Sequence, residues 1–368
     1  MEKRRIEAVD YLRGCMALAI MIYHFVGWSS GVPDGNSVLG RLGVYGVSIF
    51  YILSGMSLYV AYSRISWNRS ELFTFWKRRL LRIAPLYWVA CVGVLVLLKG
   101  YRNQSLETIL GNLTLTFGFL DYAHYIPTGG WSIGNEICFY LVFPLLIISS
   151  KNIYWFSMLC AALLAVYLQF AFFVLTDDSS LALQWKLYIH PLNQAFLFAG
   201  GVILAMVSSH VRHFSLPRSA YIALLALSLS GLFLFGNTPD AIGLVTSTNR
   251  LIFTAFSLAG CYACFNLNVT GKTWFEKILK RLGEISFSVY MLHGLLFFYL
   301  QKHLYKGFVK NLTLSQFAFF VVVPVVLIAA TYSYQKIERP FIRFGKITSG
   351  SFGERLKTAF SRYPKSAN

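Results

Sequence analysis

Arg13 and His24 lie eleven residues apart in the first apolar stretch of the chain, DYLRGCMALAIMIYHF. At 100° per helical residue, eleven residues return to within about 20° of the starting direction, so the two side chains share one helix face. A rise of ~1.5 Å per residue separates them by roughly 16 Å, about half the apolar thickness of a bilayer. Ionisable groups inside such a span are costly to bury, so this pair indicates a functional site.

A carboxylate is expected at a similar depth in a later apolar stretch, WSIGNEICFYLVFP, where Glu136 lies one helical turn after Ser132. This stretch is expected to start at the outer face and run inward, which puts Glu136 about 8 Å below the outer boundary and near the level of His24. A carboxylate beside an imidazole fixes its tautomer and raises its basicity, as a general base requires. The alternative is a buried polar pair that serves only packing.

Three arginines, Arg78, Arg79 and Arg82, open the third apolar stretch on the side where Arg13 is expected. Guanidinium groups bind phosphates through forked hydrogen bonds, so the cluster suits a phosphorylated ligand. The alternative is that these charges only set the orientation of the chain and bind the headgroups of membrane lipids.

A second histidine, His293, is expected near the middle of another apolar stretch, with Tyr290 and Ser286 within one or two turns. A polar side chain at that depth either faces a cavity or forms a hydrogen bond with a neighbouring helix. Near the end of the last stretch, Glu338 is followed by Arg339 and a proline, a pattern typical of a helix end with local ion pairing.

The elements that must position these residues are membrane-spanning helices. Of the 368 residues, 56% are hydrophobic and only 13% are charged. We therefore predict an all-α polytopic membrane protein with about ten transmembrane helices of about 17 to 23 residues each. The expected spans are 9–28, 43–63, 81–99, 131–150, 153–175, 188–208, 219–236, 247–266, 284–301 and 314–336.

The net charge of +18 follows the topology rather than a nucleic-acid partner. With the N-terminus inside, the inner connections carry about three times as many Lys and Arg residues as the outer ones, as the positive-inside rule demands. Both termini are therefore predicted to be cytoplasmic, and we expect no nucleic acid and no metal ion. The longest outer connection, 100–130, could be a lid, a substrate platform or an amphipathic interfacial segment.

Several motifs, in order, resemble the acyltransferase-3 family of integral membrane acyltransferases, over about residues 7–345. The matching segments are DYLRGCMALAIMIYH with Arg13 and His24, GVSIFYILSG, KRRLLRIAPLYW with Arg79, Arg82 and Pro85, WSIGNEICFYLVFP with Trp131, Ser132, Glu136 and Tyr140, GEISFSVYMLH with His293, and SYQKIERP. The resemblance predicts a membrane domain over 1–345 and leaves 346–368 as a basic cytoplasmic tail.

The resemblance implies an O-acyltransferase of the bacterial inner membrane that moves an acetyl group from cytosolic acetyl-CoA to an envelope or exported carbohydrate such as O-antigen or exopolysaccharide. It implies that Arg79, Arg82 and Arg78 hold the phosphates of acetyl-CoA, and that the thioester arm passes Arg13. His24, oriented by Glu136, would then activate the sugar hydroxyl directly or carry the acetyl group itself. The remaining motif residues are expected to contact substrate: Trp131, Ser132, Tyr140 and His293.

Two alternatives remain at this point. A transporter or flippase of lipid-linked sugars would also need many helices and intramembrane charges, although no inverted repeat is visible. An acyltransferase of another class would use His293, not His24, as its catalytic histidine.

Overall fold

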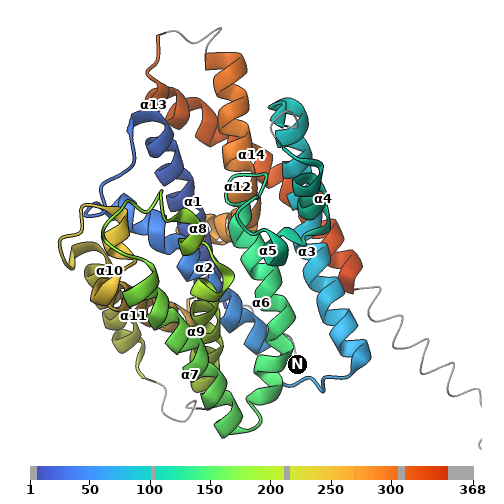
Figure 1. Cartoon of the computed structure of the whole chain (residues 1–368), viewed down its shortest axis with the longest axis vertical. Helices are drawn as coiled ribbons and strands as arrows, with labels where there is room; N and C mark the ends of the chain where they lie inside the picture. Colours follow the sequence, from blue (N-terminus) through green and yellow to red (C-terminus); the bar gives the residue numbers. More distant parts are fainter. Residues whose placement is uncertain (1–5, 101–103, 211–215, 270, 306–310, 347–368) are drawn as a thin grey trace, which may run out of the picture.

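The computed structural model describes residues 6–100, 104–210, 216–269, 271–305 and 311–346. Within these residues all regular secondary structure is helical, as expected for an all-α membrane protein (Figure 1). Each of the ten expected spans coincides with a helical segment. These are α1 (Glu7–Ser30), α2 (Val38–Tyr62), α3 (Arg69–Leu97), α6 (Gly130–Ser149), α7 (Ile153–Gln169) continued by η2 (Phe170–Val174), α9 (Pro191–His210), α10 (Arg218–Leu234), α11 (Ser247–Asn266), α12 (Trp274–Leu300) continued by η5 (Gln301–Tyr305), and the run α13 (Leu314–Phe317), η6 (Ala318–Val322), α14 (Val323–Ser333) and η7 (Tyr334–Glu338).

Among the helices of the described residues, eight are long and apolar enough to cross a bilayer. Two of the ten expected spans are not among these eight. α10 has only 17 residues, and α11 has 20 residues but starts with the polar sequence STNR. The basic tail expected at 346–368 lies outside the described residues apart from its first residue.

Contacts between helix ends agree with a chain that crosses in alternating directions. Lys280 forms an ion pair with Glu7, at 2.7 Å, where α1 and α12 both begin. At the other end of α1, the hydroxyl groups of Ser30 and Ser315 lie 2.7 Å apart. Following the charge pattern, the end with Glu7 and Lys280 is called the inner end below, and the end with Ser30 the outer end.

Glycines bring the central helices into close contact. A Cβ atom on Gly14 of α1 would lie 2.7 Å from the backbone nitrogen of Gly283 on α12, and one on Gly283 would meet the backbone of Asp10. On α2, Gly55 packs directly against the backbone of α9. Small residues permit this close approach of helix backbones. α1 is thereby held directly against α12, and α2 against α9.

The outer connection 100–130 is anchored to the bundle. It contains α4 (Leu106–Thr114) and α5 (Phe117–Leu120), and the fully buried Asn112 holds it in place. Asn112 accepts hydrogen bonds from the hydroxyl of Tyr87, at 2.6 Å, and from the backbone of Ile126, and it donates to the carbonyl of His124. A bond to α3 and two bonds within the connection fix the turn that leads into α6.

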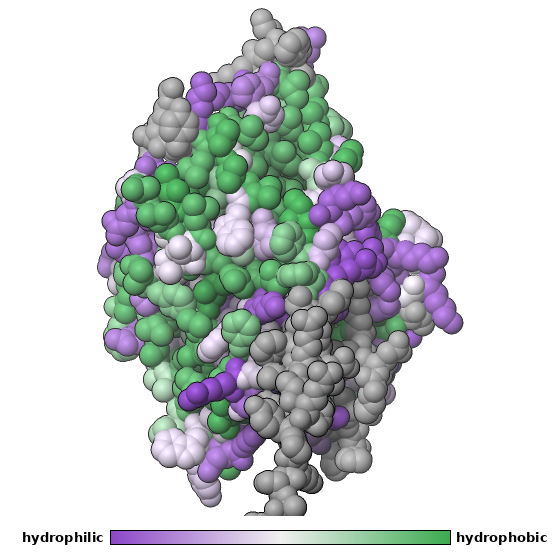
Figure 2. Space-filling model, turned by 90° about the vertical axis from the view of Figure 1, so that its right-hand side faces the viewer, coloured by the Kyte–Doolittle hydropathy of each residue, from purple (hydrophilic) through white to green (hydrophobic). Residues whose placement is uncertain are grey.

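The outside of the bundle is apolar. Figure 2 shows one side of the molecule, on which hydrophobic residues cover most of the visible surface and hydrophilic residues form smaller patches. Large exposed apolar side chains on α3 and the last span include Phe73, Val96, Phe320 and Ile328. Such a surface suits contact with lipid chains rather than water.

Candidate active site

A cavity of about 200 Å³ lies between α1, α2, α3, α6 and α12. It is lined by apolar side chains interspersed with hydroxyl and charged groups. The polar and charged side chains are Arg13, Tyr51, Ser54, Ser57, Arg79, Arg82, Ser132, Glu136, Tyr140, Ser286 and Tyr290. Along α2 the cavity reaches from Ala61 to Val47, about 21 Å at ~1.5 Å per residue. A chamber of this length can hold an extended ligand arm.

The inner end of the cavity is basic. Arg79 and Arg82 line it from the first part of α3. One nitrogen of Arg79 lies 3.4 Å from the hydroxyl of Tyr62, and Arg82 is exposed. Within the described part of the chain, no hydrogen bond or ion pair occupies Arg82. Its guanidinium is therefore available to an anion.

Arg78 lies outside the cavity lining, so the structure gathers only two of the three predicted arginines. Counted around the helix axis from Arg78, Arg82 is turned by 40° and Arg79 by 100°. The Arg82 side chain therefore points between the directions of Arg78 and Arg79. The cavity lies on the Arg79 side, and Arg78 instead adjoins Gly345 near the end of the last span.

Arg13 is held halfway along the cavity by α2. One of its nitrogens donates to the hydroxyl of Ser57 at 2.8 Å and to the carbonyl of Leu53 at 3.1 Å. Its other terminal nitrogen lies 3.5 Å from a carboxylate oxygen of Asp10. Buried cations need such partners, and these fix the guanidinium at the wall of the chamber.

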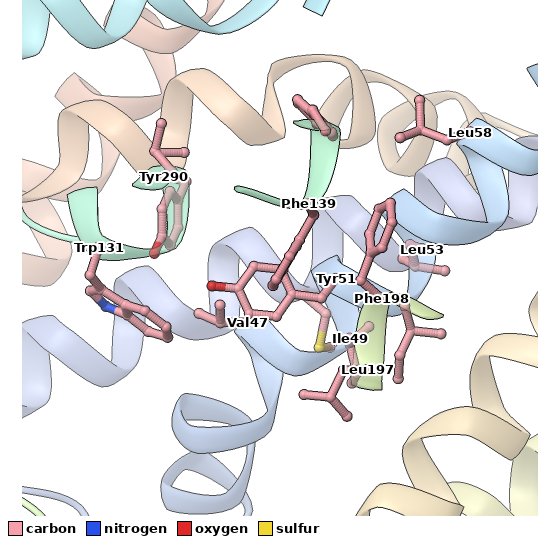
Figure 3. Close-up of a cluster of buried hydrophobic side chains, with 14 of the residues drawn as sticks. Val47, Ile49, Tyr51, Leu53, Leu58, Trp131, Phe139, Leu197, Phe198 and Tyr290 are labelled. Carbon is pink, nitrogen blue, oxygen red and sulfur yellow. The ribbon is translucent and has the colours of Figure 1, made fainter. Parts of the chain in front are cut away.

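Glu136 lines the same chamber from α6 and is bound to its own helix. Tyr140, one turn later, donates a hydrogen bond to Glu136 at 2.9 Å, and the hydroxyl of Ser54 lies 3.5 Å from that of Tyr140. Ser132, Glu136 and Tyr140 therefore form one polar stripe along α6. Trp131 packs against Tyr51 and Trp185 and does not line the cavity. Figure 3 shows it in the same buried cluster as Tyr51.

Two hydroxyl groups close the outer end of the cavity. Those of Ser132 and Tyr290 lie 2.9 Å apart, and each is within hydrogen-bond distance of the carbonyl of Gly129, at 2.9 and 3.1 Å respectively. Figure 3 shows Tyr290 in the same buried cluster as Tyr51. Tyr290 was not among the predicted site residues, although its position three residues before His293 and four after Ser286 signals a shared helix face.

His24 and His293 lie just beyond this closed end. Their rings stack with centroids 5.2 Å apart, and Trp28 stacks on His24 at 5.1 Å. Nδ1 of His293 lies 2.7 Å from the carbonyl of Tyr290. Because a carbonyl only accepts, Nδ1 carries the hydrogen, and the buried Nε2 has no partner in the described structure.

The predicted contact between His24 and Glu136 is wrong. Among the described residues no hydrogen bond joins them: Glu136 binds Tyr140, and His24 contacts His293. Similar depth in the membrane does not ensure that two side chains face each other, because they can lie on different sides of a third helix. The imidazole neighbour of His24 is supplied by α12 instead of α6.

Glu338 also differs from the prediction. It is only 4% exposed and accepts a hydrogen bond from Ser288 of α12. No ion pair with Arg339 is present in the described residues. The π-helical turn η7 packs against α3 and α12, and Glu338 bonds to a neighbouring helix where local ion pairing was expected.

The fold and the cavity define a polytopic helical membrane protein with a basic chamber that begins at the inner ends of its helices. The family model described as an acyltransferase domain matches residues 6–333, and the chain therefore belongs to the acyltransferase-3 family. It is a membrane acyltransferase that transfers groups other than aminoacyl groups. Neither the curated proteins nor the solved structures contain a match. The family match gives no support to the alternative of a sugar flippase.

Proposed function

We propose that this acyltransferase moves an acetyl group from cytosolic acetyl-CoA to a hydroxyl of an envelope or exported carbohydrate, such as O-antigen or exopolysaccharide, in a bacterial inner membrane. One observation carries the proposal beyond the family. Arg79 and Arg82 lie at the inner end of a chamber whose other end adjoins His24 and His293. In the proposal, the phosphates are bound at the inner end of this cavity and the proton is accepted just beyond its outer end.

The charge of the chamber supports a phosphorylated donor. Arg13, Arg79 and Arg82 contribute three cations to its wall, against the carboxylate of Glu136. In the proposal, Arg79 and Arg82 bind the phosphates of acetyl-CoA, because forked guanidinium groups match phosphate oxygens. The thioester arm then runs past Arg13 along α2 and ends beside Ser132.

The two histidines support proton transfer at the outer end. The acceptor hydroxyl gives its proton to His24, and its oxygen forms a bond with the acetyl carbon as the carbon–sulfur bond breaks. The coenzyme thiolate leaves and takes up a proton. A two-step route, in which His24 first carries the acetyl group, uses the same residues and releases the same products. His293 acts as the neighbour that keeps the His24 ring in place.

Acetyl transfer in isolated membranes tests this function. Membranes containing wild-type protein or the His24→Ala variant receive labelled acetyl-CoA, with total envelope carbohydrate as the acceptor. We expect base-labile labelled carbohydrate esters with the wild type alone. Equal labelling by both proteins would exclude His24 from the mechanism. Binding of acetyl-CoA without ester formation, using acceptors from several envelope fractions, would contradict the carbohydrate acceptor.

A further inference from the structure

Tyr290 takes part in both halves of the candidate site. Its side chain closes the outer end of the cavity, and its backbone carbonyl accepts the hydrogen bond from His293 at 2.7 Å. The ring centroids of Tyr290 and His293 lie 6.0 Å apart, and the His24 ring lies 5.2 Å beyond that of His293. The Tyr290 side chain therefore lies between the outer end of the cavity and the histidine pair.

The hydroxyl of Tyr290 belongs to a buried pair of hydroxyl groups. With Ser132 it makes a pair of hydroxyl groups 2.9 Å apart, and both are within reach of one acceptor, the Gly129 carbonyl. A hydroxyl group has a single hydrogen, and the bond from Ser132 already satisfies the Gly129 carbonyl, so the Tyr290 hydrogen can turn to a carbonyl oxygen in the cavity, as a donor that stabilises an oxyanion must. Both residues line the cavity and are nearly buried, with 6% and 5% exposure for Tyr290 and Ser132.

The turn before α6 is shaped to allow this arrangement. Gly129 has a positive φ of 78°, and a Cβ atom there would lie 2.7 Å from the Tyr290 hydroxyl oxygen. Glycine is the residue that adopts this backbone conformation without strain and leaves room for the phenol. The turn is itself held by the connection that Asn112 anchors to α3. The two hydroxyl oxygens are thus held in place at the wall of the cavity.

We infer that Tyr290 is a catalytic residue, whose hydroxyl turns from the Gly129 carbonyl and donates a hydrogen bond to the carbonyl oxygen of the acyl thioester, while Ser132 keeps its bond to Gly129. When the acceptor oxygen bonds to the carbonyl carbon, the electron pair of the C=O π bond moves onto the carbonyl oxygen, where the Tyr290 hydroxyl stabilises the charge. The pair then returns, the carbon–sulfur bond breaks, and the thiolate takes the proton that His24 had accepted. This role rests on the acyl transfer proposed above.

The test compares Tyr290→Phe with Tyr45→Phe. Tyr290→Phe keeps the ring that packs at the closed end and removes only the hydroxyl. Tyr45 is a matched control, since it is equally buried and donates to the carbonyl of Leu244 at 2.6 Å without lining the cavity. We expect Tyr290→Phe to lower kcat about 10²- to 10³-fold, as loss of one oxyanion donor does, with the KM for acetyl-CoA within about threefold of wild type. Tyr45→Phe should change kcat by less than about twofold.

Ser132→Ala tests the same pair of hydroxyl groups if Tyr290→Phe does not fold, which thermal unfolding of the purified protein reveals. Loss of kcat in Ser132→Ala should be smaller, and the double variant should lose less than the product of the two effects because the hydroxyl groups act together. Normal kcat in both single variants would overturn the inference, as would an effect confined to KM or an equal loss in Tyr45→Phe. A wild type that forms no ester with any acceptor would overturn the proposed function and this role with it, whereas an active wild type with active variants would overturn this role alone.

Discussion

His24 and His293 each lie ten residues after a glycine at the closest contact between their helices, Gly14 on α1 and Gly283 on α12. Both helices run from the inner to the outer end, so equal offsets of about 15 Å bring the two imidazole rings to the same level. Their centroids lie 5.2 Å apart. The stacking of the histidines is therefore set by the packing of two glycines well below them.

We predict different effects for replacement of the two histidines. His24→Ala should lower ester formation at least 100-fold, roughly the contribution of a general base, because the proposed proton acceptor is lost. His293→Ala should lower it about 10-fold, because His24 keeps its chemistry but loses the ring that holds it. Rates of labelled ester formation in membranes measure both.

His210→Ala serves as the control for histidine replacement, because His210 is exposed at the inner end of α9, away from the cavity. It should behave as wild type. The opposite ranking, with His293→Ala inactive and His24→Ala active, would assign catalysis to His293.

A second prediction separates two neighbouring arginines. Arg82→Ala should raise the KM for acetyl-CoA about 10-fold or more, because a charge-assisted hydrogen bond to phosphate contributes roughly 1.5–3 kcal/mol, and it should leave kcat at saturation nearly unchanged. Arg78→Ala removes the same charge from the same helix outside the cavity lining and should leave the KM within about twofold. Initial rates over a range of acetyl-CoA concentrations provide the comparison. If both replacements changed the KM equally, the arginines of α3 would serve the orientation of the chain and lipid binding, not binding of acetyl-CoA.

Depth and helix periodicity could be read from the sequence, and they located most of the candidate site. The ten spans coincide with helical segments, and the four-residue spacing of Ser132 and Glu136 predicted the wall of the cavity that both line. Tyr140, on the same wall, came from the family resemblance. The length of an apolar stretch shows where a helix crosses the membrane, and the period of 3.6 residues per turn shows which side chains share a helix face.

The direction in which each helix face points could not be predicted, because it depends on which helices are neighbours. That is why Glu136 was assigned to His24 although it binds Tyr140, and why Arg78 was grouped with Arg79 and Arg82. Tyr290 was missed for the same reason. Its hydroxyl acquires a partner only when the turn at Gly129 packs against α12, a contact between distant parts of the chain.

The glycine contact beneath the histidines yields the third prediction. In Gly283→Ala the added methyl group would meet the backbone carbonyl of Asp10, which cannot move aside as a flexible side chain could. Forcing α1 and α12 apart should cost about 1–3 kcal/mol of stability, more than the gain of up to ~1 kcal/mol from higher helix propensity. We expect a lower Tm and, because the rings of His24 and His293 separate, a lower kcat.

Gly260→Ala is the control for the glycine contact. Gly260 also lies inside a helix, but its added Cβ would meet Ser228 at an ordinary distance of 3.5 Å. Its Tm should stay the same or rise slightly, with no change in rate. Thermal unfolding in detergent and ester formation by the same preparations measure the two effects together. If Gly283→Ala lowered the Tm but left the rate unchanged, the contact would stabilise the bundle without setting the position of the histidines.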